Sequence, residues 1–443
     1  MNTILDFEAV KKYRKRFGTR EYLPRRFSNG ATDTIIIIPA LAELINIERL
    51  IQSLLQNDFN HLQHCLFLFV VNNIVSADEA CKNENKRTID FLNSFAKDSS
   101  KNVLIEDRCK LHIGIIDAST AGNEMPDDIG GVGLARKIGM DTALNLFAPF
   151  AKRRILVSLD ADCTVASNYI SAIRTEMLKN PNIHCGVIRY EHKIDDADEE
   201  NINAIVCYEL FLRYYTMGLI YARSDYAFHS IGSTIVCDIE TYIKVEGMNK
   251  RKAGEDFYFL EKIAKQHTVH TINSTKVFPS SRGSHRVPFG TGQRVNRFNA
   301  KGQDEYLVYH PESFICLKKW LRIIQNQQQT YMQIEKEAHN ISPELKVFLA
   351  AQKFNVFWNK AVELPEKQFP KAARVWFDGF RTLKLLHYFR DTAYPLQPMF
   401  IAVPVLAGKF DESLLRFKST RVPSRAAQIE LLYAIRKLCD DLL

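Results

Sequence analysis

The amino-acid sequence predicts an α/β fold with a mostly parallel sheet and helices on both faces of that sheet. Short β-branched runs, such as residues 34–39 (TIIIIP) and 155–159 (ILVSL), are typical of buried parallel strands. Between such runs, apolar residues recur every three or four positions, as in a helix with one buried face; the first set is Leu44, Ile47, Ile51 and Leu54. Strands that alternate with helices in this way form βαβ units, whose strands are parallel.

The predicted elements follow a regular order up to about residue 165. We expect central strands at residues 34–39, 65–71, 112–116 and 155–159. Beyond them we expect less regular strands at 184–190 and 233–236, and helices at 202–221 and 254–265. The pattern turns helical from about residue 311. We therefore expect a basic N-terminal extension (1–33), an α/β domain (34–300) and a C-terminal helical region (311–443).

The composition is that of an ordinary globular protein, with 46% apolar residues, 25% charged residues and a net charge of +8. This charge suits an anionic ligand or membrane surface, and we expect no nucleic-acid partner. The longest apolar runs, residues 35–41 and 400–407, are too short to span a membrane, and the N-terminus lacks a signal-peptide pattern. Nine cysteines show no CxxC pair or zinc spacing; several, such as Cys65, Cys185 and Cys237, lie in strand-like runs. We expect buried thiols and a cytoplasmic location.

A cluster of basic residues precedes the first predicted strand. Its members are Lys11, Lys12, Arg14, Lys15, Arg16, Arg20, Arg25 and Arg26. One interpretation is contact with acidic lipid headgroups or an anionic polymer, which would make the protein peripheral at the inner face of a membrane. The interpretation that we favour is a solvated helix packed on the edge of the domain.

Two carboxylates, Asp160 and Asp162, directly follow the strand at 155–159. Ligands of open α/β sheets bind beyond the carboxyl ends of the strands, and two aspartates there can hold a divalent cation, which in turn holds a diphosphate. A capped turn is an equally common reason for such a pair. The pair alone therefore leaves both interpretations open.

Two further segments carry candidate chemistry. In Gly254-Glu255-Asp256, at the start of a predicted helix, the carboxylates suit either a general base or simple interaction with the helix dipole. The segment Gly130–Gly139 is rich in glycine before a helix, which permits close approach to a phosphate, and Arg136 adds positive charge. It has neither the P-loop ending nor the dinucleotide-binding spacing.

Along the chain the order is the loop at 39–43, the glycine-rich segment, the Asp160/Asp162 pair and Gly254-Glu255-Asp256. In this order the segments resemble those of the inverting family-2 glycosyltransferases with the Rossmann-like GT-A fold. The resemblance covers about residues 33–295. It implies a hexosyltransferase-type enzyme that uses a nucleotide-diphospho-sugar donor, Mn²⁺ or Mg²⁺, and an acceptor hydroxyl.

The resemblance also implies roles for individual residues. Pro39, Ala40 and Glu43 match the loop that cradles the nucleoside, and Asn73 matches a position that reads the base. Arg136 matches the residue that flanks the diphosphate, Asp160 an aspartate near the ribose and Asp162 a metal ligand. Asp256 matches the catalytic base, with Glu255 beside it. The chain departs from the family at Ala42 and Lys137, where asparagine is usual, and at Asn72-Asn73, where carboxylates are usual.

The segment 279–292 is dense in cations, hydroxyls and turn-forming residues. Related enzymes often have a histidine after the base helix that completes the metal shell, and His285 is the best candidate. Arg282 and Arg286 have the charge to neutralise a departing diphosphate. The alternative is a rigid surface loop with a solvent-facing histidine.

The sequence therefore predicts a metal-dependent glycosyltransferase, in which Asp162 holds the metal, with Asp160 near it, and Asp256 is the base. Three rivals remain: a retaining GT-A glycosyltransferase, a sugar-phosphate nucleotidyltransferase, and a non-catalytic sugar-nucleotide-binding protein. Neither the donor sugar nor the acceptor, whether a saccharide, a lipid-linked group or a small molecule, is encoded in a spacing. The C-terminal helices carry no motif.

Overall fold

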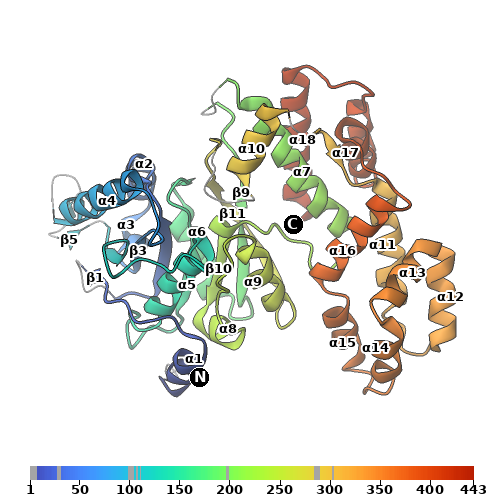
Figure 1. Cartoon of the computed structure of the whole chain (residues 1–443), viewed down its shortest axis with the longest axis horizontal. Helices are drawn as coiled ribbons and strands as arrows, with labels where there is room; N and C mark the ends of the chain where they lie inside the picture. The colour runs from blue at the N-terminus through green and yellow to red at the C-terminus, as the bar shows by residue number, and fades with distance from the viewer. Residues whose placement is uncertain are drawn as a thin grey trace. The chain divides into compact units, whose positions relative to one another are not determined.

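The computed structural model describes residues 7–26, 31–97, 104–105, 108–109, 111–195, 199–283, 290–301 and 304–443. The chain forms two compact units, which we call the sheet unit and the helical unit (Figure 1). The sheet unit comprises Met1–Asp196, Ser230–Ile263 and His267–Gln293. The helical unit comprises Ala197–His229, Ala264–Gln266 and Arg294–Leu443. The observed division differs from the expected one, because residues 197–229 group with the C-terminal helices.

Within the described residues, the sheet unit contains one nine-stranded sheet. Its strands in spatial order are β1 (Arg25–Arg26), β6 (Ile113–Ala118), β3 (Cys65–Asn72), β2 (Thr34–Ala40), β7 (Ile155–Ser158), β10 (Ile235–Asp238), β9 (Cys185–Tyr190), β11 (Val269–Phe278) and β8 (Thr164–Val165). The predicted strands are confirmed to within about two residues at most ends.

Most strands of this sheet run in one direction, as predicted. Strands β6, β3, β2 and β7 are parallel neighbours. Strand β10 is antiparallel to both β7 and β9, so β9 and the parallel β11 resume the common direction. The carboxyl ends of six strands therefore lie along the same edge, where α/β proteins bind ligands.

Helices cover both faces of the sheet, which confirms the predicted fold class. On one face, apolar side chains of α2 (Leu44–Leu55), α4 (Glu79–Lys97) and α6 (Tyr169–Lys179) join those of the strands in a continuous core. On the other face, α5 (Val132–Ala143) lies close to the sheet, because a Cβ at Gly139 would lie 2.4 Å from Ile37 Cγ2. Cys65, Cys185 and Cys237 are buried in strands, as expected.

The N-terminal helix α1 (Phe7–Phe17) is packed onto this second face through a buried polar cluster. The Tyr13 hydroxyl donates to Asp141 Oδ1 at 2.7 Å, and Tyr242 on α8 (Ile239–Lys244) donates to the same oxygen at 2.7 Å. Lys137 Nζ donates to the Tyr13 hydroxyl at 2.8 Å. The solvent face of α1 carries exposed lysines, so the helix matches the packed, solvated interpretation of the basic segment.

The helical unit is built around α7 (Ile202–Tyr221), which packs against α11 (Pro311–Ile323), α17 (Met399–Ala407) and α18 (Arg425–Leu442). Its Glu209 is buried and accepts from Arg213 and from both Arg436 Nε and Nη2, each at 2.8 Å. Apolar and aromatic residues of α7 form core, as at Tyr214, rather than an exposed stripe. Among the described residues no helix is long and apolar enough to cross a membrane.

The remaining elements are short. They are α3 (Phe59–Leu62), α9 (Glu255–Ala264), α10 (Thr291–Ala300), α12 (Tyr331–Ile341), α13 (Pro343–Ala351), α14 (Phe354–Ala361), α15 (Phe369–Trp376), α16 (Gly379–Asp391), the strand pairs β4 (Leu104–Ile105) with β5 (Arg108–Cys109) and β12 (Leu307–Val308) with β13 (Gln397–Pro398), and two 3₁₀ turns at Gly232–Thr234 and Glu412–Phe417.

The buried cluster predicts that α1 contributes to the stability of the sheet unit. Tyr13→Phe should lower the free energy of unfolding by about 1–3 kcal/mol, because Asp141 loses a buried donor. Denaturation in urea measures this change. The matched control is Tyr22→Phe, whose exposed hydroxyl lies 3.4 Å from the Asn123 carbonyl oxygen and should matter by less than about 0.5 kcal/mol. Equal effects of the two substitutions would contradict the role given to Tyr13.

Candidate functional site

Polar residues predicted from the motifs follow the carboxyl ends of strands that run in the same direction. Glu43 follows β2, Asn73 follows β3, and Arg282 follows β11. The pair Asp160 and Asp162 follows β7, in the turn that leads to β8. Because these strands run in the same direction, their ends share one edge of the sheet. The topology therefore brings to one edge residues that are far apart in the sequence.

Arg136 on α5 joins the two predicted carboxylate pairs. Arg136 Nη2 donates to Asp160 Oδ1 at 2.5 Å, and Nη1 contacts Glu255 Oε1 at the start of α9. The Arg136 side chain is only 3% exposed, and Glu255 is equally buried. The guanidinium group therefore neutralises two carboxylates that stand 24 and 119 positions away in the chain. Its predicted place beside a diphosphate remains a proposal, since these contacts use both terminal nitrogens.

Glycines make this arrangement of Arg136 possible. A Cβ at Gly232 would lie 2.3 Å from Arg136 Nη2, so the guanidinium lies directly against that backbone. A Cβ at Gly133 would lie 2.3 Å from the Arg251 carbonyl oxygen and 3.0 Å from Glu255 Cβ. The glycine-rich segment therefore lets the chain before α9 approach α5 closely. In the structure the close neighbours of these glycines are other parts of the protein.

Asp256 lies in the first turn of α9, after Gly254 with a φ of +70°. Asp256 Oδ1 accepts from the Phe257 backbone N–H at 2.7 Å. Burial raises the pKa of Asp256, and the Asp160 carboxylate adds to this, while the positive charge of Arg136 opposes it. A half-buried carboxylate with a raised pKa is a stronger base than an exposed one.

Asp162 lies in a cluster of carboxylates. Burial, and then the negative charges of Glu43 and Asp160, raise the pKa of Asp162 to about 6. Arg282 Nη2 lies 3.3 Å from Asp162 Oδ2 and also contacts Glu43 Oε1. The Asp162 side chain remains 29% exposed. It is thus a partly accessible carboxylate whose local charge balance favours a cation.

The loop between β2 and α2 places Glu43 in this carboxylate cluster. Glu43 is buried, and its second oxygen accepts from Asn46 Nδ2 at 2.5 Å. Ala42 before it has a φ of +51°, a left-handed conformation that asparagine adopts more readily than alanine. Of the other predicted loop residues, Ala40 is fully buried and Pro39 is partly buried in β2.

Asn73 is only 1% exposed, and its amide is used within the protein. Asn73 Nδ2 donates to the Ile74 carbonyl at 3.0 Å, and its oxygen accepts from Asn85 at 2.8 Å. Asn85 on α4 also accepts from the Ala42 backbone N–H at 2.9 Å. Asn85 therefore couples two loops of the site, although the sequence analysis missed it. The available signal was a polar residue at a buried position of an amphipathic helix.

Two predicted residues, His285 and Arg286, lie outside the described residues. Within the part of the chain that the structure describes, no group of three or more histidine, cysteine, aspartate or glutamate side chains has the arrangement of a complete metal site. Asp160 and Asp162 thus supply at most part of a coordination shell.

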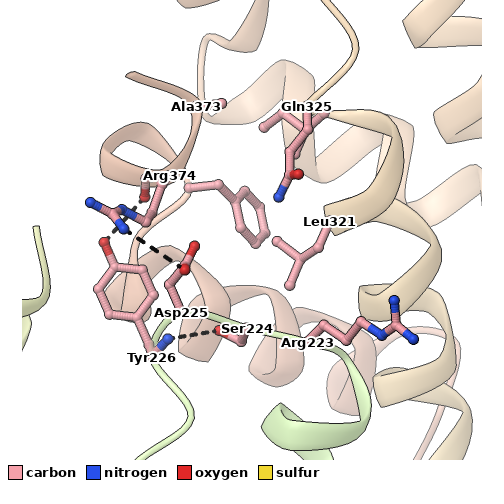
Figure 2. A pocket seen from close by; sticks show the side chains of 10 residues that line it. Arg223, Ser224, Asp225, Tyr226, Leu321, Gln325, Ala373 and Arg374 are labelled. Atoms are coloured by element: carbon pink, nitrogen blue, oxygen red, sulfur yellow. Dashed lines mark hydrogen bonds and ion pairs between the residues drawn. The ribbon is translucent and has the colours of Figure 1, made fainter. Parts of the chain in front are cut away.

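A pocket in the helical unit contains none of the predicted residues (Figure 2). Its wall includes Arg223, Asp225, Tyr226 and Arg374, and Arg374 lies 3.8 Å from the Asp225 carboxylate. The Tyr226 hydroxyl donates to the Arg374 carbonyl at 3.1 Å. These contacts tie the chain after α7 to α15, so they have a sufficient structural role.

No family model matches the chain, and no curated protein matches it in sequence. Among solved structures, the chain is similar to S. aureus TarS 1-349 in complex with UDP-GlcNAc, at 12% identity and a TM-score of 0.38, over 92% of this chain and 91% of that one. It is also similar to the mannosyltransferase PcManGT from Pyrobaculum calidifontis in complex with GDP-Man and Mn²⁺, at 11% identity and a TM-score of 0.34, over 98% and 94% of the two chains. These similarities are too distant to establish the function, which is therefore argued from the side chains of the site.

The bridge through Arg136 predicts a large and context-dependent effect on stability. Arg136→Met should lower the free energy of unfolding by about 3–5 kcal/mol, because the buried Glu255 carboxylate loses its partner. Urea denaturation of the single and double variants forms a double-mutant cycle. In a Glu255→Gln background the same substitution should cost at least about 1 kcal/mol less. Identical costs in the two backgrounds would show that the pair is not coupled.

Proposed function

We propose that the protein is a metal-dependent glycosyltransferase that moves a sugar from a nucleotide-diphosphate donor to an acceptor hydroxyl with inversion. The observation that carries this proposal is the bond of one buried guanidinium, that of Arg136, to both Asp160 and Glu255. These residues adjoin Asp162 and Asp256 in the sequence, and the Asp160 carboxylate is near enough to raise the pKa of Asp256, which supports one shared site for the proposed metal ligand and the proposed base.

The charge balance of the site supports a divalent cation. Its described side chains include five carboxylates, from Glu43, Asp160, Asp162, Glu255 and Asp256, and two guanidinium groups, from Arg136 and Arg282. When all are ionised their net charge is −3, which repels an anionic diphosphate. Magnesium-type sites commonly use one or two carboxylates together with substrate phosphates, so Asp162, with Asp160 beside it, fits such an ion without a third protein ligand.

A cation at this position would neutralise the diphosphate and stabilise the leaving nucleotide. Asp256 accepts the proton of the acceptor hydroxyl, whose oxygen forms a bond to the anomeric carbon while the bond from that carbon to the diphosphate breaks. Attack from the face opposite the diphosphate inverts the anomeric centre. The buried Arg136 keeps Asp160 and the start of α9 in a fixed relation during this exchange.

The identity of the anomer and of the leaving group tests the reaction class. With an inverting transferase, NMR shows the product anomer opposite to that of the donor, and a nucleoside diphosphate is released. A retained anomer would indicate the retaining alternative, and released pyrophosphate would indicate a sugar-phosphate nucleotidyltransferase. Thermal stability with Mn²⁺ and a panel of nucleotide sugars identifies the donor, because a ligand that binds the folded state alone raises that stability. Saccharide, lipid-linked and small-molecule acceptors are then tested with that donor.

Adjacent carboxylates on α9 should have different roles. Asp256→Asn should lower kcat by about 10²–10⁴-fold while nucleotide binding persists, because the proton acceptor is lost. Glu255→Gln should retain more of kcat and instead lower stability, because Glu255 bonds Arg136 and has no access to substrate. Turnover by Asp256→Asn equal to that of the wild type would remove Asp256 from the mechanism and favour the non-catalytic alternative.

The raised pKa of Asp256 predicts the acid limb of the pH–rate profile. A base must be deprotonated to act, so kcat/KM should fall as the pH drops through the pKa of Asp256. Burial places this limb above the usual aspartate value of 3.8. Steady-state rates measured across the acid range check the position of the limb. A limb at or below the usual value would argue against Asp256 as the base.

A further inference from the structure

Arg282 joins two carboxylates that come from different loops of the proposed donor site. Its Nη2 atom contacts Glu43 Oε1, from the loop after β2, and lies 3.3 Å from Asp162 Oδ2, after β7. The Arg282 side chain is 34% exposed, whereas that of Glu43 is 8% exposed. Arg282 Nε is buried and has no hydrogen-bond partner among the described residues. Both contacts of the guanidinium with these carboxylates are made by Nη2.

This contact conflicts with the binding of a cation. A divalent cation at Asp162 needs the carboxylate oxygens of that residue and repels a guanidinium at hydrogen-bond distance. One oxygen of Asp160 is also engaged, because Arg136 donates to its Oδ1 at 2.5 Å. Arg282 and the cation therefore compete for Asp162.

We propose that Arg282 closes the cation site in the ligand-free enzyme and leaves Asp162 for the donor diphosphate when donor and cation bind together. This inference rests on the proposed function. Arg282 thereby makes the cation and the donor bind cooperatively. Alone, a cation must remove Arg282 from Asp162 without offering it a new anion. With a nucleoside diphosphate present, the guanidinium exchanges one anionic partner for another, for which its planar donors are well suited.

The exchange has a reciprocal consequence. If the donor raises the affinity for the cation, the cation raises the affinity for the donor by the same factor. Coupling of this kind usually amounts to about 5–150-fold. The enzyme would then bind little metal until the donor is present. Until then, Arg282 would neutralise the carboxylates around Asp162.

The test measures Mn²⁺ binding to the full chain by electron paramagnetic resonance of the free ion, without nucleotide. Arg282→Gln should bind Mn²⁺ about tenfold more tightly than the wild type, because the competitor for Asp162 is gone. The matched control is Lys276→Gln. Lys276 is 33% exposed, lies on β11 and pairs with Glu191 instead of Asp162 or Glu43, so its loss removes the same charge without removing a partner of those two carboxylates. It should leave the affinity for Mn²⁺ within about twofold of that of the wild type.

The same titration with UDP or GDP present gives the second readout. Nucleotide should tighten Mn²⁺ binding in the wild type and should do so much less in Arg282→Gln. An unchanged or weaker Mn²⁺ affinity in Arg282→Gln, or the same increase in Lys276→Gln, overturns the role of Arg282 and leaves the proposed reaction standing. Failure of both the wild type and Arg282→Gln to bind Mn²⁺ overturns this inference and the cation of the proposed function together.

Discussion

The arrangement of the site depends on the burial of one guanidinium group, that of Arg136. A buried positive charge is tolerated when carboxylates surround it with good hydrogen bonds, and Asp160 and Glu255 meet that condition from two sides. The backbone at Gly232 lies against this guanidinium, and the backbone at Gly133 lies against Arg251 and Glu255, each closer than a side chain would permit. Burial of one guanidinium thus links the turn after β7, the start of α9 and α5.

The second property of the site is an excess of negative charge at its open side. Arg136 is buried and already bonded to two carboxylates. The negative charge of the accessible carboxylates is therefore balanced by Arg282, from the chain after β11. An enzyme that handles a diphosphate with such a surface needs a movable positive charge, from a metal ion or from an arginine. In the mechanism proposed above both are used in turn, so Arg136 is the structural arginine and Arg282 the exchangeable one.

The strands and the candidate carboxylates were predictable because their signals are local. Each of these signals can be recognised within a few residues: a β-branched run, an Asp-x-Asp turn and a Gly-Glu-Asp helix start. The bond between Arg136 and Glu255 spans 119 positions, so no local pattern indicates that Arg136 is a buried bridge. For the same reason the sequence analysis missed Asn85. It also grouped α7 with the sheet, because apolar periodicity indicates that one face of a helix is buried but not which part of the protein covers that face.

The path of the chain through the two units has a consequence for how the protein is built. The chain leaves the sheet unit after Asp196, forms α7 and returns at Ser230 to supply β10 and α9 before it completes the helical unit. The central helix of the helical unit is thus an insertion within the sheet unit. Its Glu209 pairs with Arg213 on the same helix and also with Arg436, more than two hundred residues later. Neither unit is a continuous segment of the chain. Neither could therefore be gained, lost or exchanged by inserting, deleting or replacing one continuous stretch of the gene.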